Sequence, residues 1–190
     1  MIYDLELFKK YEIKLSWDII IYGLENHFLS YDFVESYLYD KLENQGGLLE
    51  SEMNLLVNLI DSKKNPYFDF RVKDLIAAIN KLNNIKFNEK FAKNSFQYLA
   101  LQTILAKYEP KLDKLFYKKD CEDLCFELYY FWEEFNFDPF LRECCDYPYW
   151  LEELEDLEDN LNYITYVKDV ISSIKGYLKE LSERYNWFYN

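Results

Sequence analysis

Apolar residues recur every three or four positions along most of this chain, which is the spacing of one face of an α-helix. After Gly47, for example, Leu49, Met53, Leu56 and Ile60 follow one another at steps of four, three and four residues. The pattern predicts a helix whose core-facing stripe contains these four side chains and is widened by Leu48, Leu55 and Leu59. Comparable stripes and breaks predict further helices over residues 17–26, 31–44, 70–82, 88–108, 111–117, 120–135, 138–145 and 154–185.

Two of these helices begin with the same short motif. Leu15-Ser16-Trp17-Asp18 and Leu29-Ser30-Tyr31-Asp32 each place a serine where its hydroxyl can cap a helix. Each also places an aspartate in the first turn, where the helix dipole favours a negative charge. Residues 17–44 should therefore form an antiparallel helix pair.

The predicted helix over residues 88–108 is apolar on two faces, so we expect it to be central. In the helix that follows, Asp120 is expected to be the N-cap. Cys121 and Cys125 fall on its apolar stripe, which favours buried, reduced thiols over metal ligands. The last stripe is too long for one straight helix in a small domain, so a bend near residues 160–162 is expected. Association as a coiled coil is the alternative to covering this stripe within the chain.

The composition agrees with an all-helical protein. The chain has 190 residues, half of them apolar, with only four glycines and four prolines. We predict an all-α, single-domain helical bundle of roughly eight to ten helices over residues 1–190. The first residues lack a secretory signal and no apolar run is long enough to span a bilayer, so a cytoplasmic protein without membrane contact is expected.

The net charge of −13 is concentrated in one segment. Residues 120–160 hold 15 acidic residues and one basic residue, whereas the other residues hold 20 acidic and 21 basic ones. Crowded like charges oppose compaction, which suggests a partner of opposite charge. The alternative is that these acids only form the solvated face of a helix.

Aromatic residues are interleaved with these acids, and aromatics supply rigid contact area that a purely solubilising surface does not need. We therefore predict that this segment binds a protein with a basic surface. The candidate contact residues are the exposed acids and tyrosines of the segment: Glu133, Glu134, Tyr147, Tyr149, Glu152, Glu153, Glu155, Asp156 and Asp159.

The sequence offers little catalytic chemistry. His27 is the only histidine, and its place at a predicted helix end suits a capping or core residue better than a catalytic one. No glycine-rich phosphate-binding motif is present, and the basic residues form no stripe that could follow a nucleic-acid backbone. We expect no enzymatic activity, no cofactor, no metal site and no nucleic-acid binding.

The motif beginning at Leu15, continued by Ile19-Ile20-Ile21-Tyr22-Gly23-Leu24 and repeated from Leu29 to Asp32, resembles the start of a small helical bacterial family of unknown function. Members of that family occur among the immunity proteins of polymorphic-toxin and contact-dependent inhibition loci. The resemblance implies a small cytoplasmic protein, monomeric or weakly dimeric, that neutralises a cognate toxin, often a basic nuclease. A helical adaptor or scaffold without inhibitory role is the second hypothesis.

Overall fold

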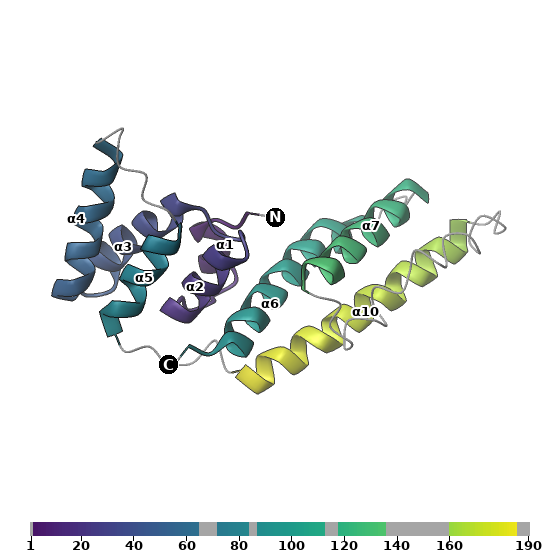
Figure 1. Cartoon of the computed structure of the whole chain (residues 1–190). Helices are drawn as coiled ribbons and strands as arrows, with labels where there is room; N and C mark the ends of the chain where they lie inside the picture. The colour runs from purple at the N-terminus through teal and green to yellow at the C-terminus, as the bar shows by residue number, and fades with distance from the viewer. Residues whose placement is uncertain (1, 65–71, 84–86, 113–117, 136–159, 186–190) are drawn as a thin grey trace. The chain divides into compact units, whose positions relative to one another are not determined.

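The computed structural model describes residues 2–64, 72–83, 87–112, 118–135 and 160–185 (Figure 1). Throughout these ranges the regular elements are helices, with no strand among them. This confirms the predicted all-α fold. The described helices are α1 (Leu5–Lys10), α2 (Trp17–Glu25), α3 (Tyr31–Asn44), α4 (Glu50–Lys64), α5 (Val72–Asn83), α6 (Glu89–Tyr108), the 3-10 helix η1 (Glu109–Lys111), α7 (Lys118–Glu134) and α10 (Asn160–Tyr185).

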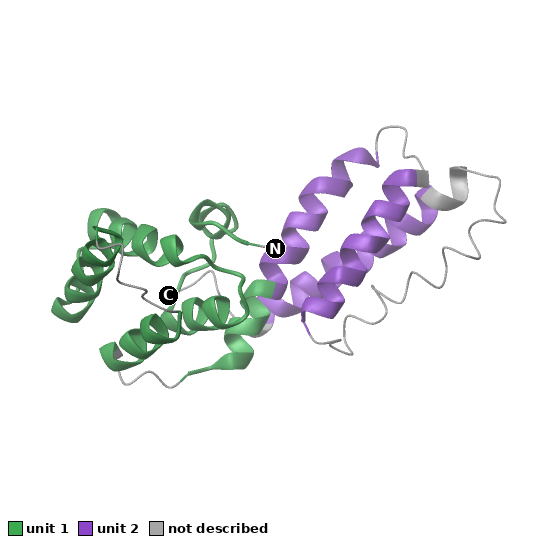
Figure 2. Ribbon diagram, turned by 45° about the horizontal axis from the view of Figure 1, so that its top comes forward, with its two compact units in different colours: residues 1–96, 190 green, residues 97–189 purple. Residues whose placement is uncertain are grey.

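The chain divides into two compact units, residues 1–96 and residues 97–189 (Figure 2). The boundary falls inside α6, so the first two turns of that helix belong to the first unit and the remainder to the second. That residues 1–190 form a single domain stays a prediction.

The first unit contains α2 and α3, and both helices begin where the repeated motif placed them. They do not pack mainly on each other as the predicted antiparallel pair, because α2 packs against α5 whereas α3 packs against α4 and α1. Ser16 and Ser30 occupy the two N-cap positions with extended backbone angles, but neither side chain makes a capping hydrogen bond. The capping role expected of the two hydroxyls is therefore wrong. The backbone conformation of these serines, rather than their side chains, marks the start of each helix.

Rings packed around Phe96 form the core of the first unit. The ring of Phe96 lies 5.7 Å from those of Tyr3 and Phe8, 5.9 Å from Tyr22 and 5.2 Å from Phe28, measured between centroids. These separations are typical of favourable aromatic packing. Residues 3–8 and 22–28, both far from Phe96 in sequence, thus meet at the first turns of α6.

Gly23 permits the tight turn that joins α2 to α3. A Cβ atom at this position would lie 2.5 Å from Leu29 Cγ and 2.6 Å from Phe96 Cζ. The carbonyl oxygen of Gly23 accepts hydrogen bonds from the backbone N–H groups of Phe28 and Leu29, at 2.7 and 3.0 Å. The turn and the ring cluster therefore both need a residue without a side chain here.

Helix α4 differs from its prediction in which face it buries. The buried side chains are those of Glu52, Leu55, Leu56 and Leu59, whereas Leu49 and Met53 of the predicted stripe are exposed. Burial of Leu55, Leu56 and Leu59 confirms the main part of the predicted stripe, and only its Leu49–Met53 edge is wrong, because α4 carries apolar residues on more than one face. Packing against α3 and α5 selects the face that is covered.

The second unit contains α7 and α10 beside the rest of α6 (Figure 1). Ion pairs join Lys107 to Glu127 and Lys111 to Asp120, so α7 runs antiparallel to the end of α6. Because α7 begins at Lys118, Asp120 lies in its first turn and is not the predicted N-cap. Its carboxylate accepts a hydrogen bond from Lys111 Nζ at 2.5 Å instead.

The expected helix over residues 111–117 does not begin as predicted, because the chain forms the 3-10 helix η1 at Glu109–Lys111 and a turn at Leu112. Pro110 lies inside η1, where a missing N–H is tolerated. The remaining residues of that expected helix, 113–117, and the one predicted over residues 138–145 fall outside the described residues.

The long C-terminal stripe is covered within the chain, as preferred over a coiled coil. The buried residues of α10 recur at three or four positions and belong to one face: Val167, Val170, Ile171, Ile174, Tyr177, Leu178 and Leu181. This face packs against α7. No helix in the described part of the chain combines the length and apolar character needed to cross a bilayer.

Candidate protein-binding face

Helix α7 has one fully apolar face and one acidic face. Its buried side recurs at helical spacing through Cys121, Leu124, Cys125, Leu128, Phe131 and Phe135. Helical spacing predicts that these six residues and Trp132 face the core; the six are buried, which confirms the prediction, whereas Trp132 is only half-buried. The opposite side of the same helix carries the exposed aromatic and acidic residues that are candidates for binding a protein.

Two aromatic residues project from that opposite side. The side chains of Phe126 and Tyr130, one helical turn apart, are 52% and 60% exposed. The ring of Tyr130 makes an edge contact with that of Tyr129, with centroids 6.1 Å apart. Exposed neighbouring aromatics are costly in water and are enriched where proteins bind one another.

Acidic residues surround the two exposed rings. Asp123 lies one turn before Phe126, and Glu133 lies one turn after Tyr130, so all four lie along one line on the helix. Asp123 and Glu133 are exposed, and neither has an ion-pair partner among the described residues. We call Glu122, Asp123, Phe126, Tyr130, Glu133 and Glu134 together the α7 acidic face.

Other acids of α7 have structural roles and are not part of this face. Glu127 accepts hydrogen bonds from Lys107 and from the hydroxyl of Tyr108, the latter at 3.0 Å. Burial, together with the hydrogen bond to Glu127, raises the pKa of Tyr108, so this tyrosine stays a neutral donor. The structure thus separates acids that fasten α7 to α6 from acids that are directed toward solvent.

Two of the nine predicted contact residues lie in the described part of the chain. Glu133 and Glu134 are exposed at the end of α7, as predicted. The other seven lie outside the described residues: Tyr147, Tyr149, Glu152, Glu153, Glu155, Asp156 and Asp159. For those seven the binding role stays a prediction.

Neither Phe126 nor Tyr130 is among the contact residues predicted from the sequence. A helical wheel drawn from Cys121 would have placed both opposite the buried stripe, since Phe126 and Tyr130 are four residues apart. The missing signal was therefore available locally.

Glu52, in the first unit, is a buried carboxylate that sequence patterns did not single out. It accepts hydrogen bonds from Trp17 Nε1 at 3.2 Å, from Lys41 Nζ at 2.5 Å and from the backbone N–H of Leu49 at 3.0 Å. Burial opposes its ionisation, but Lys41 and the other donors outweigh that effect and lower its pKa. Because its three donors come from α2, α3 and the residue before α4, this carboxylate links the three helices.

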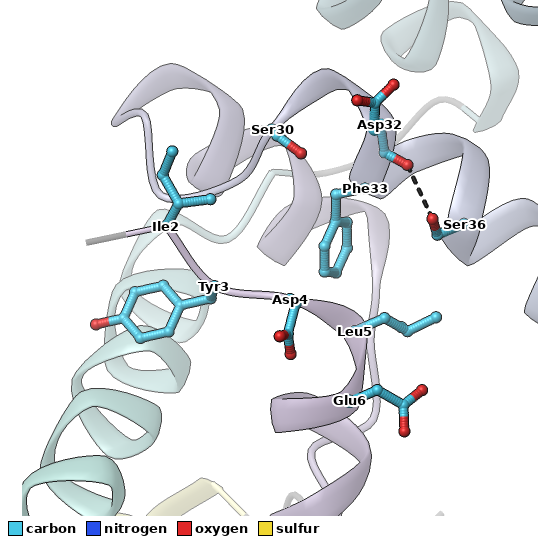
Figure 3. A pocket seen from close by; sticks show the side chains of 9 residues that line it. All are labelled: Ile2, Tyr3, Asp4, Leu5, Glu6, Ser30, Asp32, Phe33 and Ser36. Atoms are coloured by element: carbon cyan, nitrogen blue, oxygen red, sulfur yellow. Dashed lines mark hydrogen bonds between the residues drawn. The ribbon is translucent and has the colours of Figure 1, made fainter.

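An open hollow of about 370 Å³ lies beside the N-terminal residues and the first turns of α3 (Figure 3). Three acids line it, but each is already engaged. Asp4 accepts a hydrogen bond from the backbone N–H of Leu7 at 2.9 Å, Glu6 pairs with Lys9 at 3.3 Å, and Asp32 pairs with Lys63 at 2.6 Å. The acids of this hollow therefore stabilise the local helices.

The remaining candidates for chemistry also have structural positions. Cys121 and Cys125 are free and buried, and their mutual hydrogen bond together with burial raises the pKa of the Cys125 thiol. His27 is exposed just after the end of α2, with a left-handed φ of 59°, so it terminates the helix. Among the described residues, no three His, Cys, Asp or Glu side chains form a group that could hold a metal ion.

Comparison with known proteins places the chain in a family. No curated protein and no solved structure matches it. The family model that does match is DUF2247, described as an uncharacterized protein conserved in bacteria, and the match extends over residues 5–182. Because it includes nearly the whole chain, with α1, α7 and most of α10, the protein belongs to the DUF2247 family.

Proposed function

We propose that this protein is an immunity-type inhibitor that acts in the cytoplasm and neutralises a cognate bacterial toxin domain, such as a basic nuclease. In this proposal the α7 acidic face docks over a basic cleft of the toxin and excludes its substrate. The observation that carries the proposal is the pair of exposed rings, Phe126 and Tyr130, bracketed by the exposed carboxylates of Asp123 and Glu133.

The distribution of charge between the units supports a basic partner. Residues 97–190 contain 20 acidic and 10 basic residues, a net charge of −10, whereas residues 1–96 contain 15 and 12, a net charge of −3. Charge of one sign on one side of an interface steers an oppositely charged partner and raises the association rate. Acids and aromatics would then contribute to different steps of binding.

The division of labour follows from solvation. Exposed carboxylates act over the Debye length, which is about 30 Å at 0.01 M salt and about 10 Å at 0.1 M, so they accelerate the encounter. Phe126 and Tyr130 act only on contact, when their surfaces leave water, so they slow dissociation. Acids would accelerate association and aromatics would slow dissociation in the same way if the protein were an adaptor that binds its partner without inhibiting it.

The test uses the polypeptide encoded beside this chain's gene, expressed alone and together with the full chain. Inhibition predicts that the neighbouring protein is toxic to cells and that co-expression restores growth. Growth that is unaffected by the neighbouring protein, or toxicity that co-expression leaves unchanged, contradicts the immunity proposal. A stable complex without any effect on toxicity supports the adaptor hypothesis.

Binding kinetics then test the face itself by surface plasmon resonance at two salt concentrations. The double variant Asp123→Asn, Glu133→Gln should mainly slow association, whereas Phe126→Ala should speed dissociation, with a loss of about 2 kcal/mol or more for a true anchor. The matched control is Lys168→Ala on the exposed side of α10, which should change neither rate. An association rate that is independent of salt contradicts electrostatic docking even if the complex is tight.

A further inference from the structure

Helix α4 carries a second surface that the proposed function does not use. Leu49, Met53 and Val57 follow one another at steps of four residues and are 58%, 38% and 47% exposed. Leu49 immediately precedes α4, and the three side chains lie on a flank about a third of a turn or more from the buried residues Leu55 and Leu59. This α4 stripe (Leu49, Met53 and Val57) is long and apolar, and such surfaces mark interaction sites on folded proteins.

The neighbouring helix extends this apolar surface. Tyr39 and Leu42 of α3 are also exposed, and α3 packs against α4 in a hairpin. In that hairpin the ion pairs from Lys63 to Asp32 and Glu35, and from Lys41 to Glu52, join one flank of α3 to α4. Tyr39 lies on the same flank of α3 as Glu35, one turn along. Together with the stripe, Tyr39 and Leu42 make the α3–α4 hairpin rich in exposed apolar side chains.

The charges at the two ends of α4 suggest what covers the stripe. Glu50 is exposed in the first turn, and Lys64 is exposed in the last turn, where its contact with Asp61 is long at 3.5 Å. Val57 lies seven residues from each of them. A second α4 packed antiparallel about a twofold axis near Val57 therefore brings Glu50 of each copy opposite Lys64 of the other.

Other positions agree with this register. About the same axis the two Val57 side chains meet, and Met53 of one copy faces Asp61, next to Ile60, in the other. Antiparallel packing also aligns the two helix dipoles favourably. A surface that is complementary to itself in shape, polarity and charge fits a twofold homodimer, in which the same patch serves both subunits.

We propose that the α4 stripe is the interface of a weak, antiparallel homodimer. The location is favourable because residues 1–96 have a net charge of only −3, so two copies repel each other less there than through the acidic residues 97–190. One helix pair with its neighbouring side chains is a small interface, so a dissociation constant on the order of micromolar is expected. This proposal does not depend on the proposed function, since it uses none of the α7 acidic face.

Analytical ultracentrifugation of the full chain over a range of concentrations tests the dimer. The wild type should pass from about 23 to about 47 kDa, twice the mass of 23.3 kDa. Val57→Arg should abolish the dimer, because the two arginines meet at the axis. The matched control is Asn58→Arg, the next residue on the solvent side, which should still dimerise. A wild type that stays monomeric, or a Val57→Arg variant that dimerises like the control, overturns the proposal.

Charge reversal tests the antiparallel register. Glu50→Lys and Lys64→Glu should each weaken dimerisation by about tenfold, since each variant places like charges opposite each other twice. The double variant should restore dimerisation to near the wild-type level. Circular dichroism of each variant controls for loss of α4, and a double variant that is helical but as weak as the single ones contradicts this register.

Discussion

In the first unit Phe96 is buried against four other rings, whereas in the second unit Phe126 and Tyr130 are exposed between carboxylates. The same residue type thus stabilises one unit and is available for binding in the other. The difference lies in the neighbours. Phe96 is surrounded by rings from two distant stretches of the chain, residues 3–8 and 22–28, while the outer side of α7 is bounded by acids that remain hydrated.

The units differ in charge as much as in aromatic packing. In the first unit the buried acid Glu52 is saturated by three donors, and Asp32 and Asp40 are paired with lysines. In the second unit, acids such as Asp123 and Glu133 are exposed without an ion-pair partner in the described residues. Acids that are already ion-paired or hydrogen-bonded within the fold attract a charged partner less than unpaired acids do. The second unit is therefore the better candidate for electrostatic recognition.

Removing the central ring should have the largest effect. Phe96→Ala deletes the side chain that four rings contact, and the expected loss of stability is about 4 kcal/mol, because both burial and close packing are lost. Urea unfolding followed by circular dichroism measures the change. A loss below about 1 kcal/mol would mean that the cluster refills the cavity and that the first unit is less tightly packed than described.

Neutralising the buried acid should have the next largest effect. Glu52→Gln leaves Lys41 without its counter-charge, and because Lys41 is partly exposed the expected loss is about 2 kcal/mol. The unfolding midpoint in urea measures it. Glu50→Gln, two residues earlier and exposed, is the matched control and should change the midpoint little.

The same carboxylate should make stability depend on pH. The pKa of Glu52 is lowered on folding, so the unfolded chain binds more protons when pH falls below its ordinary value of 4.5. The stabilisation is fully present above that value and is lost as pH falls through the folded pKa. Glu52→Gln should therefore flatten the acid limb of the stability curve, and an unchanged acid limb would show that the ion pair adds nothing to it.

Two glycines allow the same substitution to be compared in the two units. Gly23→Ala should destabilise by about 1–3 kcal/mol, because the new methyl group meets Leu29 and Phe96. Gly176→Ala in α10 meets nothing within 4 Å and should stabilise by up to about 1 kcal/mol through helix propensity. Thermal unfolding of both variants checks the signs, and an equal sign for both would contradict the packing described around Gly23.

Truncating the exposed rings should change stability least. Phe126→Ala and Tyr130→Ala remove side chains that are mostly in water, so each should alter the free energy of unfolding by no more than about 0.5 kcal/mol. Chemical denaturation checks this directly. A loss comparable to that of Phe96→Ala would show that these rings are part of a core and not of a binding face.

Much of the helical architecture could be predicted from local patterns. The starts of α2 and α3, the two apolar faces of α6 and the buried stripe of α7 all follow from spacing, because 3.6 residues per turn place such residues on one side wherever the helix packs. Of the candidate site, Glu133 and Glu134 were predicted as exposed for the same reason.

Local patterns could not decide which of two apolar flanks is covered. In α4 the sequence permits either Leu49 and Met53 or Leu55 and Leu59 to face inward, and only the arrangement of α3 and α5 selects the second pair. Likewise, nothing local marks Glu52 as buried, since its three donors come from Trp17, Lys41 and the backbone of Leu49.

The sequence by itself determined that this chain is helical, where most of its helices begin, and that its negative charge is concentrated in residues 120–160. Tertiary structure decided which acids form ion pairs or hydrogen bonds within the fold and which aromatic rings remain exposed to water. The physical reason is that periodicity is a property of neighbouring residues, whereas burial is a property of the surface that a distant segment covers. Phe96 and Phe126 cannot be told apart until that covering is known.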